Sequence, residues 1–165
     1  MDDLLTPNSN FQAIGLDKFY KFTNLKLKTL PALLRLGFKE KEIFKGASAI
    51  EPFQQYYRII YTNGKRSVAF FMYDESGGHY IVSVTEKVEF NEGDMFDLEH
   101  YYKTHGNSEN IATKGFRISN YTGSLEKRVG ESLDSINHLF EGKIEAILSG
   151  DEWIEIPPPG FFDYK

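Results

Sequence analysis

The sequence predicts an α+β fold, in which an antiparallel sheet of four to six strands packs against a long C-terminal helix and a short N-terminal helix. Two β-rich runs, 57–62 and 67–72, flank Asn63-Gly64, a residue pair typical of a tight hairpin. A third strand-like run, 80–90, completes a central meander. Apolar residues then recur every three or four positions from 125 to 148, as in an amphipathic helix. A run of strands followed by a helix favours α+β over a parallel α/β fold.

The N-terminal part predicts short elements. Residues 1–12 are polar and rich in turn formers, so we expect a loose arm there. Residues 16–24 have helical spacing of apolar side chains, whereas 25–28 alternate as a strand does. We therefore expect a short helix followed by a short strand.

Residues 29–37 predict a second short helix. Thr29 is suited to cap it, Pro31 is tolerated in a first turn, and Gly37 is suited to the left-handed end. The leucines at 30, 33 and 34 form the expected buried stripe.

The C-terminal part predicts a strand, a helix and an apolar tail. A further strand is expected at 114–121, where apolar and polar residues alternate. The helix from 124 to 149 is expected to break near Gly142 and to end at Gly150. Residues 151–165 read as a short strand followed by a proline-rich aromatic tail. That tail either packs on its own sheet or binds a partner.

Bulk composition sets limits on the class of protein. The 165 residues suit a single domain, and 41% hydrophobic with 15% aromatic content is typical of a folded chain. The absence of cysteine excludes disulfides and thiolate chemistry and suits a reducing compartment. No signal-peptide pattern and no run of about 20 apolar residues is present, so we expect a cytoplasmic protein without a membrane partner.

Charge is divided along the chain. Residues 1–66 carry 11 Lys/Arg and 6 Asp/Glu, whereas 67–165 carry 8 and 18, which gives the net charge of −5. The densest acidic cluster is formed by Glu89, Glu92, Asp94, Asp97 and Glu99. This cluster has three possible roles: a solvated or partner-facing surface, a metal site, or a catalytic carboxylate pair. The cluster lacks the ligand pattern of a calcium loop, so the sequence predicts no metal and no cofactor.

Catalytic motifs are not recognisable. Ser76 and His79 belong to a predicted turn, and His100 and His105 lack the spacing of a zinc helix. A hydrolase using carboxylates with His79 or His100 remains one alternative. A module that binds nucleic acid or a small ligand is another. It would use the sheet face and the basic N-terminal third, where lysines alternate with aromatic residues. The acidic whole chain, with a pI of about 5.4, makes nucleic acid the less expected ligand.

A small, cysteine-free, acidic and aromatic-rich α+β chain resembles the bacterial immunity proteins that neutralise toxin domains, including those of contact-dependent inhibition systems. The resemblance is one of general character over the whole chain. It implies a non-enzymatic protein that binds and occludes a cognate toxin, often a cationic nuclease, through an acidic surface. Tyrosines are frequent interface anchors, and rim charges mainly set the association rate. The candidate partner contacts are Glu92, Asp94, Asp97, Glu99, Glu131 and Asp134, with Tyr101 and Tyr102 as anchors.

Overall fold

The computed structural model describes residues 15–47, 54–74, 77–90, 94–105, 113–142 and 144–154. The helices are α1 (Leu16–Leu27), α2 (Pro31–Arg35), α3 (Leu98–His105), α5 (Leu125–Phe140) and α6 (Glu145–Ser149), with two 3-10 turns, η5 (Lys114–Phe116) and η6 (Ile118–Asn120). The strands are β1 (Lys39–Ala47), β2 (Gln55–Thr62), β3 (Ser67–Tyr73), β4 (His79–Thr85) and β5 (Met95–Asp97). This α+β arrangement confirms the predicted fold class. The expected arm, 1–12, and the tail beyond 154 lie outside the described residues.

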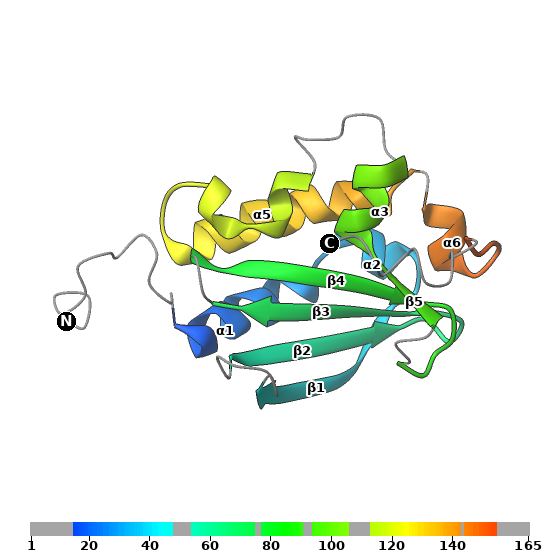
Figure 1. Cartoon of the computed structure of the whole chain (residues 1–165), viewed down its shortest axis with the longest axis horizontal. Coiled ribbons are helices and arrows are strands. Elements are labelled where there is room, and N and C mark those ends of the chain that lie inside the picture. Colours follow the sequence, from blue (N-terminus) through cyan, green and yellow to red (C-terminus); the bar gives the residue numbers. More distant parts are fainter. Residues whose placement is uncertain are drawn as a thin grey trace, which may run out of the picture.

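The strands form one antiparallel sheet in the order β1-β2-β3-β4-β5, so each strand pairs with its neighbour in sequence (Figure 1). The predicted meander of β2, β3 and β4 is therefore confirmed. β4 ends at Thr85 rather than near Phe90, and the chain bends over residues 86–89.

The connection between β2 and β3 differs from the predicted two-residue turn. Thr62 pairs with Ser67, so the loop has four residues, 63–66. Asn63 Oδ1 accepts hydrogen bonds from the backbone N–H groups of Lys65 (3.0 Å) and Arg66 (2.9 Å). The asparagine side chain thus closes the loop together with a backbone hydrogen bond from the Asn63 N–H to the Arg66 carbonyl (3.3 Å).

The sequence did not predict β1, β5 or α3, and it wrongly predicted a strand at 114–121. β1 begins with four alternating lysines and glutamates, which have low strand propensity, and a bulge between Glu40 and Glu42 interrupts its alternation. Residues 114–121 form η5 and η6 instead. Phe116 and Ile118 are completely buried in these turns. The alternation of apolar and polar residues over 114–121 therefore comes from two successive turns and not from a strand.

Residues 16–27 form one helix, so the predicted short strand at 25–28 is wrong. Phe19, Thr23 and Leu27 recur every four residues and are completely buried. This helical stripe outweighs the local alternation, which leaves Leu25 58% exposed.

The start of α2 also differs from expectation. Its N-cap is Leu30, and the Thr29 hydroxyl donates to the Lys26 carbonyl at the end of α1 instead of capping α2 (2.9 Å). Gly37 has a φ of 82°, as predicted for a left-handed end. Two of the three expected stripe leucines are buried, but Leu34 is 60% exposed.

The predicted long helix is divided, as expected, at Gly142. α5 ends at Phe140, α6 begins at Glu145, and Gly142 between them has a φ of 101°. Ser124 caps α5 by accepting a hydrogen bond from the backbone N–H of Lys127 (3.2 Å). The apolar stripe of both helices lies in the core.

The helices cover one face of the sheet. The ring of Phe19 in α1 lies 5.0 Å from that of Tyr80, and Phe140 in α5 lies 6.1 Å from Phe70. α2 joins the same layer, because Asn137 Oδ1 of α5 accepts a hydrogen bond from the Ala32 N–H (2.8 Å). None of the described helices has the length and apolar character needed to cross a lipid bilayer.

Candidate functional site

Two of the predicted partner-binding carboxylates, Asp97 and Glu99, lie where β5 passes into α3. Asp97 Oδ1 accepts hydrogen bonds from the backbone N–H of Glu99 (2.9 Å) and His100 (3.5 Å), so it caps the helix. Burial raises the pKa of the Asp97 carboxyl. Glu99 Oε2 lies 2.8 Å from Arg117 Nη1 and 3.2 Å from Lys103 Nζ, and its side chain is 16% exposed. Both carboxylates therefore have partners within the chain.

The other predicted carboxylates are spread over separate elements. Glu131 contacts a lysine one turn earlier in α5 (2.8 Å), and Asp134 contacts Lys26 of α1 (3.0 Å). The second contact joins the basic N-terminal part to the acidic C-terminal part. Asp94 directly precedes β5, and Glu92 lies outside the described residues. The described groups thus lie on different elements, and Glu99, Glu131 and Asp134 are in ion pairs, so part of the predicted acidic surface is neutralised within the chain.

Tyr101 and Tyr102, the predicted anchors, belong to the hydrophobic core. Their exposed fractions are 8% and 7%. The Tyr101 ring lies 5.5 Å from Phe96, and the Tyr102 hydroxyl donates to the Leu139 carbonyl (2.6 Å). Both rings therefore attach α3 to the rest of the fold and present little surface to a partner.

The structure describes His79 and His100, the two histidines named for the alternative hydrolase. No group of three or more His, Asp or Glu side chains is placed there to hold a metal ion. The His79 ring stacks on Tyr73 at 5.1 Å, and Ser76 lies outside the described residues. A hollow of about 290 Å³ lies between α1 and α5, and its only ionisable lining residues are Lys26 and Glu126.

The face of the sheet opposite the helices carries a cluster of aromatic side chains. Arg58 of β2 is paired with Phe44 of β1 and with Phe71 of β3. Directly paired residues of an antiparallel sheet share a face, and strand side chains alternate between faces. These three residues therefore point away from α1, whose rings contact the neighbouring Tyr57. We call Phe44, Tyr56, Phe71, Tyr73 and Phe90 the aromatic face.

Tyr56 connects the rings of the aromatic face. Its ring lies 6.1 Å from Phe44, 5.8 Å from Phe71 and 5.5 Å from Tyr73, and Phe71 lies 5.9 Å from Phe90. The rings are tilted against one another, an arrangement favoured by aromatic pairs. Phe44 is 40% exposed and the other four are half-buried. The rings form one continuous, partly solvated surface.

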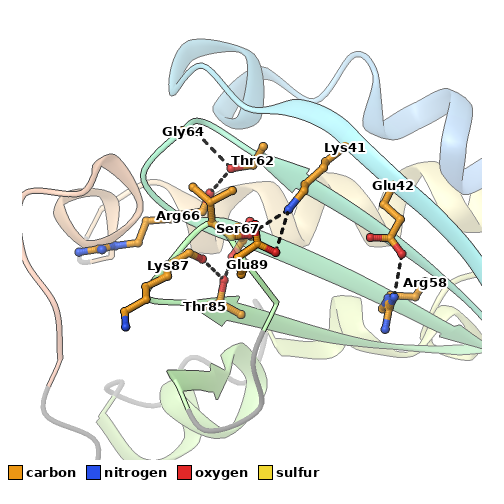
Figure 2. Close-up of polar contacts among 11 residues, drawn as sticks. Lys41, Glu42, Arg58, Thr62, Gly64, Arg66, Ser67, Thr85, Lys87 and Glu89 are labelled. Carbon is orange, nitrogen blue, oxygen red and sulfur yellow. Dashed lines mark hydrogen bonds and ion pairs between the residues drawn. The ribbon is translucent and has the colours of Figure 1, made fainter.

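Arg58 lies among these rings. Its Cζ atom is 4.8 Å from the centre of the Phe44 ring and 5.1 Å from that of Phe90. Its Nη2 atom donates to Glu42 Oε2 (3.1 Å), as Figure 2 shows. The guanidinium is therefore held by two aromatic rings and one carboxylate, and its charge is compensated within the face.

Residues 86–90, which we call the strap, cross part of this face. Ser67 Oγ donates to the Val88 carbonyl (2.5 Å), and Lys41 Nζ lies 3.8 Å from Glu89 Oε1 (Figure 2). These contacts fasten the strap to β3 and β1 and bring Phe90 onto the sheet. The second cation of the face, Lys41, thereby also has a carboxylate neighbour.

The aromatic face was not predicted from the sequence, although β3 contains a signal for it. A strand with one solvated face alternates apolar and polar residues, whereas the run from Val68 to Met72 is apolar throughout. Phe70 points toward the helices, and Phe71 points to the opposite face of the sheet. An uninterrupted apolar strand in an antiparallel sheet thus indicates that both faces are covered or available for contact.

Comparison with models of protein families, with curated proteins and with solved structures gave no match.

Proposed function

We propose that this chain is a non-catalytic, cytoplasmic binding protein that recognises another protein through the aromatic face. In the manner of immunity proteins, it would act by covering a functional surface of a cognate toxin domain. The observation that carries the proposal is the group of partly exposed aromatic rings around Arg58, on the sheet face that no described helix covers. Aromatic residues and arginine are enriched in protein interfaces and dominate their binding energy.

The charge of the aromatic face favours a protein partner over a polyphosphate. Arg58 is paired with Glu42 and Lys41 lies beside Glu89, so neither cation is available to neutralise phosphates without losing its partner. Binding of nucleic acid depends on cations that replace condensed counterions. A locally neutral aromatic surface instead matches an apolar patch with a polar rim on a protein.

Two acidic residues lie on this side of the sheet, and Asp94 contributes to this proposal as a rim charge. Ser83 is paired with Asp97, and Ala69 is paired with Ser83, so Asp97 lies on the same side of the sheet as the aromatic face. Asp94 lies at the same edge, at the start of β5. Negative charges at the rim accelerate the approach of a cationic partner and add little to the final affinity.

The test is capture of the partner from cells of the organism that encodes the chain, using tagged wild type and single variants. Phe71→Ser and Phe90→Ser should each weaken retention about 30-fold, as expected for an interface hot spot. Leu34→Ser in α2 is the matched control, because Leu34 is an exposed leucine on a different element. Circular dichroism establishes that each variant is folded. Equal retention by all variants would refute the role of the aromatic face.

A separate variant tests the rim charges. Asp94→Lys should slow association with the partner at low ionic strength and have a smaller effect at high salt, because salt screens the interaction. The dissociation rate should stay close to that of wild type. Surface plasmon resonance at two salt concentrations measures both rates.

A module that binds single-stranded nucleic acid is the second candidate, and one observation favours it. Aromatic rings on an open antiparallel sheet are a platform on which bases stack. Fluorescence polarisation with labelled single-stranded DNA and RNA at low salt decides between the two. Binding that is abolished by Phe71→Ser would replace the proposal above.

A further inference from the structure

β1 is an outer strand of the sheet and has no neighbour on its outer side among the described strands (Figure 1). Eight of its nine residues are exposed. The unpaired N–H and C=O groups of an exposed edge strand form a template for another strand. The side chains and the regularity of β1 therefore determine whether this edge pairs with a second chain.

The two parts of β1 differ in this respect. The first part, 39–41, carries alternating charges and the bulge at Lys41, both of which hinder pairing in extended sheets. The second part, 42–47, is regular. It presents Ile43 and Phe44, 39% and 40% exposed, on opposite faces. Only this part is suited to accept another strand.

Charge restricts which register a second copy of β1 could adopt. In an antiparallel pair of two identical strands related by a two-fold axis, directly opposed side chains lie on the same face of the sheet. One residue at the axis must therefore lie opposite the same residue of the second copy. If the axis passes at Glu42 or at Lys45, that residue lies opposite the same charge of the second copy. If it passes at Ile43, Lys41 of one copy lies opposite Lys45 of the other. Centred on Phe44, the pair opposes Ile43 to Lys45 and places no like charges opposite each other over 42–46.

We propose that two copies of this chain associate through residues 42–46 of β1, antiparallel and centred on Phe44. Phe44 then packs on Phe44 of the second copy, on the sheet face that carries Tyr56 and Arg58. Gly46 leaves room for the Phe44 ring on this face, because a Cβ at position 46 would collide with that ring. The two sheets become one, and the two aromatic faces become continuous across the two-fold axis.

On the opposite face, Ile43 of each copy packs along the carbon stem of Lys45. The Lys45 ammonium is held 3.3 Å from Asp17 Oδ1, which directs its charge toward its own α1. Five residues per copy are fewer than the roughly 20–30 per side of a standard interface. The dimer is therefore weak and depends on concentration. This inference goes beyond the proposed function and does not depend on it.

The experiment is sedimentation equilibrium of the full chain from about 10 μM to about 1 mM, a range that spans a weak self-association. The mean mass of wild type should rise from the monomer value of 19.0 kDa toward twice that value. Phe44→Asp and Phe44→Lys should each remain monomeric, because a like charge then opposes itself at the two-fold axis. An equimolar mixture of the two variants should dimerise again, and native mass spectrometry should identify the heterodimer.

The matched controls are Leu34→Asp and Leu34→Lys, which remove an even more exposed apolar residue from α2 (60%, against 40% for Phe44) and should self-associate as wild type does. The proposal is overturned by any of three results: wild type monomeric at about 1 mM, Phe44→Asp dimeric, or no heterodimer in the mixture. Hydrogen exchange of wild type gives a readout without substitutions. Backbone amides within 42–46 should gain protection as concentration rises, and unchanged protection also refutes the pairing.

Discussion

The Cζ atom of Arg66 lies 5.0 Å from the centre of the Trp153 ring and links the hairpin loop to the last described segment of the chain. The same guanidinium donates to three carbonyls, those of Ile147 (2.9 Å), Glu86 (2.7 Å) and Glu152 (2.6 Å). Arg66 is 9% exposed. One buried cation therefore joins the β2–β3 loop, the strap and the end of α6.

Replacement of Arg66 by Met should destabilise the fold by about 3 kcal/mol or more, because it removes charge-assisted hydrogen bonds and leaves buried carbonyls without donors. Urea denaturation measures this loss. Trp153 is the only tryptophan of the chain, so its emission reports on the same contact and should shift to longer wavelength. Arg35→Met is the control. Arg35 forms exposed ion pairs, so the expected cost is within about 1 kcal/mol.

Asp97 should influence the pH dependence of stability. Burial raises the pKa of its carboxyl above the ordinary value of 3.8, so the ionised form disfavours folding. This penalty is present above the folded-state pKa and disappears as the pH falls toward the unfolded value. Asp97→Asn keeps an acceptor for the cap and removes the charge. It should therefore be more stable than wild type at pH 7, with a difference that shrinks in acid.

The cap itself is tested by Asp97→Ala, which should cost about 1 kcal/mol because the first N–H groups of α3 lose their acceptor. Thermal unfolding of the three proteins between pH 4 and pH 8 gives the comparison. An Asn variant that remains less stable than wild type throughout would show that the cap requires the charge.

Two glycines should respond oppositely to the same substitution. A methyl group at Gly115 would lie 2.7 Å from the Ser132 carbonyl oxygen and 2.8 Å from Ser135 Cβ, so Gly115→Ala should destabilise by about 1–3 kcal/mol through overpacking. Gly130 lies inside α5 with nothing within 4 Å of the added carbon. Gly130→Ala should stabilise by about 1 kcal/mol, because alanine favours a helix over glycine. Chemical denaturation of both variants measures the opposite signs.

The buried pair of Thr23 and Tyr80 connects α1 to β4. Their hydroxyl oxygens are 2.7 Å apart, and both residues are almost completely buried. Tyr80→Phe should cost about 1–2 kcal/mol, since it leaves the Thr23 hydroxyl without its partner. Adding Thr23→Val should recover part of that loss, and a double-mutant cycle measures the coupling. Strictly additive losses would contradict the pairing.

Local signals explain why several elements could be predicted. The hairpin around Gly64, the helix that begins after Ser124 and its break at Gly142 all depend on turn chemistry or on spacing within a few residues. β1 could not be predicted in this way. Its lysines and glutamates have low strand propensity, and it is a strand because it pairs with β2.

In the candidate site, too, residue types could be predicted from the sequence, whereas their surroundings could not. The acidic candidate contacts could be found from the sequence, but whether their charges are free to meet a partner depended on basic residues distant in the chain, such as Arg117 beside Glu99 and Lys26 beside Asp134. Tyr101 and Tyr102 were suitable anchors by residue type, whereas the packing of α3 determined that both are buried. Sequence spacing does not contain these long-range contacts.

By itself, the sequence determined the α+β class, the central meander and the apolar stripe of the C-terminal helices, because alternation and helical periodicity are local properties of a chain. The tertiary structure alone decided which side of the sheet the helices cover and which side presents Tyr56 and Phe71. Each strand has two faces, and only packing against segments distant in sequence assigns one of them to the core.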